Sequence, residues 1–219
     1  FISSDLGNAL AQKTHSLREA GRLAEAEESL KSYLRVSREI ESPPGYLSGI
    51  YAGAANFRFS QREFVQAESY ARKSDKILEA LAYEPVHPSR LARAQDLIIA
   101  LQGQKRWPQA LAEFERLDKL AGDDKVLRGR VLFPAERALA YLWNGKADQA
   151  AELLAGVAAS NGRRYGAGHF FPAQSSGLQG VALWRTATAA NRAQALPLLK
   201  NAVRAFMAPA NADFMEDVG

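Results

Sequence analysis

The 219-residue sequence contains no cysteine. A disulfide framework, a thiolate metal site and a cysteine nucleophile are therefore excluded within it. No apolar stretch approaches the roughly 18 residues that suggest a transmembrane helix. The first residue is Phe1, and the sequence has no basic region followed by an apolar segment of the kind that forms a signal peptide. We therefore expect a processed chain or an excised domain.

Residues and motifs that carry chemistry are scarce too. The three histidines, His15, His87 and His169, lie far apart in the sequence and do not predict a metal site. The glycines at 162, 166 and 168 neither follow a strand pattern nor precede the Lys-Ser/Thr of a phosphate-binding loop. We expect no catalytic residue, no cofactor and no metal in this chain, so any enzymatic domain would lie outside it.

The charge balance is mildly basic, at +4 with a pI near 9.4. Arginine and lysine are interleaved with glutamate and aspartate through most of the chain, which is typical of solvated helix faces. We therefore do not favour nucleic acid as a partner. Binding to nucleic acid or another anionic surface stays open as an alternative, and would use these five arginines: Arg128, Arg130, Arg137, Arg163 and Arg164.

A repeat organises the sequence. Five alanines stand in matching surroundings at separations of 41, 43, 40 and 45 residues, each with a small or apolar residue four places later. They are Ala26, Ala67, Ala110, Ala150 and Ala195. Self-similarity at this period predicts a stack of helical repeats in which each copy packs only on its neighbours.

Proline and glycine positions divide the stack into helices. We expect five repeats at about 3–41, 45–84, 88–122, 124–160 and 171–207, and a C-terminal tail or linker at 208–219. In the fourth repeat one helix is expected to run from Asp124 through Trp143, and the segment 162–169 is expected to be a loop. In the fifth, helices are expected at 171–189 and 192–207. No strand pattern lasts more than a few residues.

These copies resemble tetratricopeptide (TPR) repeats, which combine a small residue where two helices cross, a glycine at the turn and an alanine in the second helix. The crossing position is occupied by Thr14, Ala55, Ile98, Ala138 and Leu183. The turn position is occupied by Gly21, Arg62, Lys105, Gly145 and Ala190. The resemblance implies an all-α fold, a right-handed superhelical solenoid of about five helix pairs.

The resemblance also implies a binding surface. In TPR proteins the first helix of each repeat lines a concave face, and three positions around the crossing residue point into it. Transferred by register, the candidate partner-binding residues are His15, Arg18, Asn56, Phe59, Gln95, Ile99, Gln102, Leu139 and Trp184. Such a face would hold a protein or an extended peptide, with Asn56, Gln95 and Gln102 pairing with its backbone. Phe59, Leu139 and Trp184 could equally complete the packing between repeats.

The period of about 42 residues narrows the resemblance further. A loop carrying Val86-His87-Pro88 resembles the longer repeats of kinesin light chains and those that precede caspase-like CHAT proteases in bacteria, and 164–169 looks like a decayed copy. The resemblance implies a regulatory region for a protease beyond Gly219. The basic, Ala/Leu/Arg-rich composition favours a bacterial source, with the protein in the cytoplasm or the periplasm. A structural oligomerisation module is the remaining alternative, and would use Phe170, Phe171 and Trp184.

Overall fold

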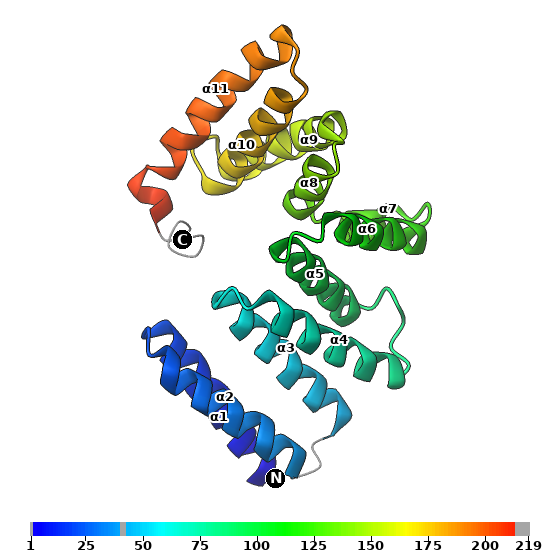
Figure 1. The fold of residues 1–219 in the computed structure, drawn as a ribbon, viewed down its shortest axis with the longest axis vertical. Coiled ribbons are helices and arrows are strands. Elements are labelled where there is room, and N and C mark those ends of the chain that lie inside the picture. The colour runs from blue at the N-terminus through cyan, green and yellow to red at the C-terminus, as the bar shows by residue number, and fades with distance from the viewer. Residues whose placement is uncertain (1, 40–42, 213–219) are drawn as a thin grey trace. The chain divides into compact units, whose positions relative to one another are not determined.

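A computed structural model describes residues 2–39 and 43–212, and the secondary structure within these ranges is helical throughout (Figure 1). The helices are α1 (Ile2–Glu19), α2 (Leu23–Glu39), α3 (Pro44–Ser60), α4 (Phe64–Ala80), α5 (Pro88–Gly103), α6 (Trp107–Ala121), α7 (Lys125–Arg130), α8 (Pro134–Trp143), α9 (Ala147–Tyr165), α10 (Phe170–Arg185), α11 (Ala189–Phe206) and the 3₁₀ helix η1 (Pro209–Asn211). The expected all-α class is confirmed.

The chain divides into two compact units. The first contains α1 to α5, and the second contains most of α6 together with α7 to α11. Within each unit, helices that follow one another in the sequence pack together: α1 on α2, α3 on α4 and α4 on α5 in the first, α8 on α9, α9 on α10 and α10 on α11 in the second (Figure 1). This sequential pairing is the arrangement of a TPR-like solenoid.

The five repeat alanines are completely buried, with no exposed surface at any of them. They occur once per repeat on the second helix, where a small side chain lets the first helix approach. The residue four places later is buried as well in the first four copies and half-buried in the fifth: Leu30, Ala71, Phe114, Leu154 and Leu199. The predicted core positions are therefore confirmed.

The turns between paired helices share one backbone geometry. A residue with positive φ follows the first helix at Gly21, Arg62, Lys105 and Gly145, as the repeat register predicts. In these four turns the next amide donates to a carbonyl five residues earlier, as Arg106 N does to Leu101 O at 2.8 Å. This αL termination satisfies carbonyls that the helix end leaves unpaired.

The fifth turn was predicted at the wrong residue. The left-handed residue is Ala187 and not Ala190, and α11 begins at Ala189. The observed turn lies three residues before the predicted one. Three residues are close to one helical turn, so Ala195 faces the core with either turn position. The small crossing residue is Gly180 and not Leu183: a Cβ at Gly180 would lie 3.1 Å from the carbonyl oxygen of Ala195.

The fourth repeat also differs from the expected single helix. The chain forms α7 to Arg130, breaks at 131–133 and resumes as α8 at Pro134. Proline disfavours helical geometry in the residue before it, and Phe133 has a φ of 38°. Downstream, α9 continues to Tyr165, so the first part of the segment expected to be a loop is helical.

Side-chain amides link consecutive repeats inside each unit. Asn144, which follows α8, donates from Nδ2 to Trp107 O at 3.0 Å and to Ala140 O at 2.7 Å. Gln104 occupies the equivalent position in the first unit and donates to Phe64 O and Ala100 O. Each amide therefore joins the end of one first helix to the start of the previous second helix.

Candidate peptide-binding pocket

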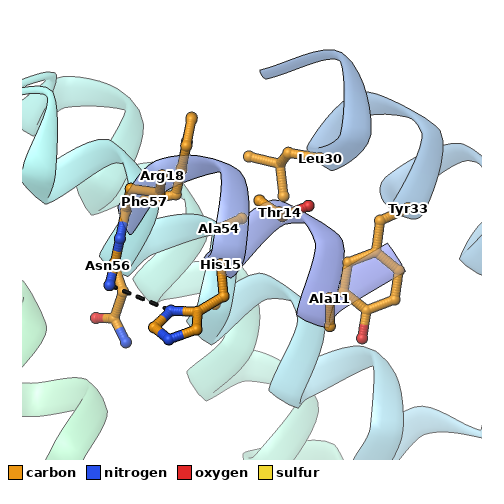
Figure 2. Close-up of a pocket in the computed structure, with 10 residues that line it drawn as sticks. Ala11, Thr14, His15, Arg18, Leu30, Tyr33, Ala54, Asn56 and Phe57 are labelled. Carbon is orange, nitrogen blue, oxygen red and sulfur yellow. Dashed lines mark hydrogen bonds between the residues drawn. The ribbon is translucent and has the colours of Figure 1, made fainter. Parts of the chain in front are cut away.

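A pocket of about 190 Å³ opens between the first and second repeats, on the first unit (Figure 2). Its walls come from α1, α2 and α3. It brings together three residues of the predicted partner-binding surface, His15 and Arg18 from α1 and Asn56 from α3. The complete lining is Ala11, Thr14, His15, Arg18, Leu30, Tyr33, Gly53, Ala54, Asn56 and Phe57.

The rim of the pocket is polar and carries positive charge. One guanidinium nitrogen of Arg18, Nη2, lies 3.3 Å from Nδ1 of His15, as the dashed line in Figure 2 shows. The same guanidinium pairs with Glu19, and its hydrogen bond and charge lower the pKa of that carboxyl. Asn56 is exposed and its amide makes no hydrogen bond with any residue in the part of the chain that the structure describes.

The floor of the pocket is made of small and apolar groups. Ala11 on α1 and Gly53 and Ala54 on α3 line it with small groups, and a Cβ at Gly53 would meet nothing within 4 Å. Buried Leu30 and Phe57 add apolar surface to the lining. This combination of an apolar floor and a few polar groups at the rim is the usual chemistry of a ligand site.

Two hydroxyls complete the walls. Thr14 donates to Leu10 O at 2.8 Å and lies 3.0 Å from the hydroxyl of Ser29, so it also joins α1 to α2. Burial raises the pKa of Tyr33, and a hydrogen bond with Tyr46 raises it further. Tyr33 therefore stays a neutral phenol in the pocket wall.

The remaining candidates on the first unit lie outside this pocket. Phe59 on α3 and Gln95 and Ile99 on α5 are half-buried. Gln102 is buried, with 8% of its surface exposed, so its amide is not presented to solvent. The structure therefore brings His15, Arg18 and Asn56 together and leaves the α5 candidates separate from them.

Two candidates belong to the second unit. Leu139 is half-buried on α8, and Trp184 on α10 is half-exposed with the Arg192 guanidinium 5.5 Å from its ring. The corrected fifth turn places Trp184 four residues after the crossing residue Gly180, and not one residue after it.

The pocket includes residues that the sequence register did not select. Tyr33 and Leu30 belong to the second helix of their repeat, where their spacing assigned them to the core, and Phe57 and Gly53 lie beside the transferred positions. Their helical spacing places these side chains next to the predicted ones, but it does not reveal where the packing leaves space.

The structure removes one residue from each alternative surface. Arg137 is buried and holds both carboxylate oxygens of Asp118, at 2.7 and 2.8 Å, so it is not part of an exposed basic patch. Phe170 is buried in the core, whereas Phe171 and Trp184 are partly exposed. A basic interface would have to use the other four arginines, and an aromatic interface would have to use Phe171 and Trp184.

Residues 2–39 and 43–212 contain no group of three or more potential metal ligands. None of the helices in these ranges combines the length and apolarity needed to cross a membrane.

The fold resembles that of known TPR-like proteins. Two crystal structures of a Podosopora anserina putative kinesin light chain with nearly identical TPR-like repeats match it, with TM-scores of 0.74 and 0.69 and identities of 21% and 22%. The alignments cover 94% and 90% of this chain and 96% and 93% of the other. The TPR protein YrrB, described as having an unusual peptide-binding site, matches with a TM-score of 0.52, 16% identity and coverage of 94% and 90%. No family model and no curated protein matches the sequence.

Proposed function

We propose that the chain is a protein- or peptide-binding scaffold whose binding site includes the pocket of His15, Arg18 and Asn56. One observation carries the proposal: these three residues line one pocket although Asn56 comes from a different repeat than His15 and Arg18. The unpaired amide of Asn56 offers both a donor and an acceptor to a peptide backbone. The small floor residues leave room for a side chain of the bound segment.

The pocket selects for a particular kind of segment. Its base is apolar, so burial of an apolar side chain supplies affinity, at about 25 cal/mol per Å² of surface removed from water. The His15–Arg18 rim favours acceptor groups, and the pairing of Arg18 with Glu19 reduces its net charge. We therefore expect an extended peptide with an apolar side chain beside polar or acidic positions, and binding that depends only weakly on salt.

The experiment uses two glycines of α3 that are one helical turn apart. Gly53 lines the pocket and Gly49 does not, and an added Cβ would meet nothing within 4 Å at either. Peptides selected by the full chain from a random displayed library should lose binding to Gly53→Leu, which fills the pocket, and keep it with Gly49→Leu. Asn56→Ala should weaken binding about tenfold, or about 1.4 kcal/mol. Equal binding to both glycine variants would rule out the pocket.

We further propose that the natural partner belongs to a caspase-like CHAT protease of the same bacterial protein, which occupation of the pocket would regulate. The support is the repeat period and the loop resemblance. His87 and His169 both cap the following helix, accepting from Ser89 N and Phe171 N, and each contacts a tyrosine four residues earlier. The gene sequence downstream of Gly219 tests this, because a reading frame without a His/Cys protease domain would refute it.

A further inference from the structure

A second pocket, of about 200 Å³, lies within the second unit between α9, α10 and α11. Helix α10 packs on both of the other helices here (Figure 1). Apart from Ser176 and Asn201, all the residues that line it are alanine, glycine, proline or leucine. An apolar cavity of about 150 Å³ can hold a benzene molecule, so this α9–α11 pocket has room for one large apolar side chain.

The pocket lies where an earlier junction between repeats contains an ion pair. Asp75 on α4 binds Arg90 on α5, with Oδ1 and Nε 2.9 Å apart. Asp75 stands eight residues after the buried alanine of its helix, and Arg90 stands three residues after the histidine that caps the next helix. Counted in the same way, the corresponding residues are Ala158 on α9 and Pro172 on α10, and both line the pocket. These smaller side chains leave open the space that the ion pair fills between α4 and α5.

The two polar side chains of the pocket have no hydrogen-bond partner in the described part of the chain. Ser176 on α10 is half-buried and Asn201 on α11 is exposed, and neither side chain makes a hydrogen bond with any of residues 2–39 and 43–212. A hydroxyl and an amide can each donate and accept. They can therefore bind the backbone of a segment whose apolar side chain enters the pocket.

The charges around the pocket are all positive. No aspartate or glutamate occurs from residue 153 to residue 212, whereas the same segment contains five arginines and one lysine. Arg163 directly follows the pocket residue Gly162. Lys200 directly precedes Asn201, and Arg204 lies about one helical turn after it. These three cations are exposed, and none forms an ion pair with another described residue. The site therefore favours an anionic partner.

We propose that the α9–α11 pocket is a second binding site, which takes one large apolar side chain from an acidic protein segment. Acidic residues on either side of that side chain pair with Arg163, Lys200 and Arg204. A polypeptide fits better than a nucleic acid, because no aromatic side chain lines the pocket and bases bind single-strand sites by stacking on such rings. The site shares polypeptide binding with the proposed function but not its pocket, so either proposal can fail alone.

Two glycines of α9 provide a matched pair of variants. An added Cβ would meet nothing within 4 Å at Gly162, which lines the pocket, or at Gly156, which does not. Peptides are selected from a random displayed library on the full chain with Gly53→Leu, so that the pocket of His15 is already filled. They should carry a large apolar residue between acidic ones. Adding Gly162→Leu should weaken their binding at least about tenfold, and adding Gly156→Leu should not.

Two further comparisons test the space and the charge. The double variant Ala158→Asp/Pro172→Arg introduces the ion pair of the α4–α5 junction and should block the same peptides, which keeps the test valid if Gly162→Leu lowers stability. Arg204→Gln should weaken binding about two- to fivefold. Arg192→Gln, nine residues before Asn201 on α11, should not. Higher salt should also weaken binding, because the cations are exposed.

Three results would overturn the proposal. The first is a set of selected peptides without acidic residues. The second is equal binding of the selected peptides to the chains with Gly162→Leu and Gly156→Leu. The third is an oligouridylate that binds more tightly than every selected peptide and is unaffected by Gly162→Leu, which would assign the cations to nucleic acid. None of these results changes the comparison of Gly53→Leu with Gly49→Leu, which tests the pocket of His15 separately.

Discussion

At the scale of single residues, Asp96 is a largely buried acid whose pKa rises when the chain folds. Its carboxylate lies on α5, 3.1 Å from Nη2 of Arg93, yet burial outweighs that attraction and raises its pKa from 3.8 to about 6. Oδ2 of Asp96 and Nε of Arg93 are both buried without a hydrogen bond. The folded chain therefore keeps a proton that the unfolded chain has already released.

This difference predicts a loss of stability as the pH rises. Between about pH 4 and 6 the folded state binds the proton of Asp96 and the unfolded state does not, so the free energy of unfolding should fall across that window by at most about 3 kcal/mol. Asp96→Asn should lack the decrease. Urea denaturation of both proteins at several pH values measures it. Glu152→Gln, an exposed substitution on α9, should keep the wild-type decrease, and the same decrease in Asp96→Asn would show that another group causes it.

Gly103 makes a second prediction at this scale. It ends α5 directly against the ring of Phe64, and a Cβ there would lie 2.3 Å from two ring carbons. Gly103→Ala should therefore destabilise the chain by about 1–3 kcal/mol through overpacking. Gly49→Ala, in α3 with open space around it, should be neutral or stabilise by up to about 1 kcal/mol, because alanine is the better helix former.

The midpoint of urea denaturation distinguishes the two glycine variants. The double variant Gly103→Ala/Phe64→Leu should recover part of the loss, because the smaller side chain makes room for the new methyl group. If Gly103→Ala were as stable as Gly49→Ala, the contact with the Phe64 ring would not limit the packing of α4 on α5.

At the scale of elements, the side chain that joins consecutive repeats must be a hydrogen-bond donor. Nδ2 of Asn144 faces two carbonyl oxygens, those of Trp107 and Ala140. Asn144→Asp should lower the free energy of unfolding by about 1–3 kcal/mol, because a carboxylate cannot donate to either carbonyl and places its negative charge beside both oxygens. Asn144→Gln should stay close to wild type, since Gln104 makes the equivalent bonds in the first unit. Thermal melts measure both, and equal stability of the two variants would contradict the role of the donor.

Helix registers were largely predictable from sequence because they depend on single small residues. Gly21 and Gly145 mark their turns directly, and Arg62 and Lys105 were located only by their distance from a buried alanine. The fifth turn was misplaced for two reasons. It lies at Ala187, where no glycine or asparagine indicates a turn. The shift of three residues is also close to one helical turn, so Ala195 still faces inward and fits the repeat register.

The pocket was only partly predictable for a different physical reason. Register identifies which side chains point away from a helix axis, and three of the residues that it selected, His15, Arg18 and Asn56, line one pocket in the structure. Whether space remains between them depends on the volumes of residues from three helices. Gly53 and Ala54 create that space, and Tyr33 on the second helix limits it, which no single helix pattern reveals.

At the scale of the whole molecule, ion pairs made by buried arginines join adjacent repeats within each unit. Arg58 on α3 binds Glu27 on α2 through both guanidinium Nη atoms at 2.7 Å, and Arg137 on α8 binds Asp118 of α6 in the same manner. In a repeat array each copy contacts its neighbours alone, so stability is close to a sum of local terms. Loss of one of these ion pairs should therefore destabilise the adjacent helices and leave distant repeats unchanged.

Hydrogen exchange of two reciprocal variants tests this locality. Arg58→Met removes the two short hydrogen bonds that the partly buried Glu27 accepts, a cost of about 1–3 kcal/mol, and should reduce amide protection in α2 to α4 while α9 and α10 keep theirs. Arg137→Met should give the opposite pattern, with losses in α8 and the neighbouring part of α6 and none in α2 to α4. A uniform loss of protection in either variant would mean that the chain unfolds as one cooperative body, and stability would then be a property of the whole array and not of neighbouring repeats.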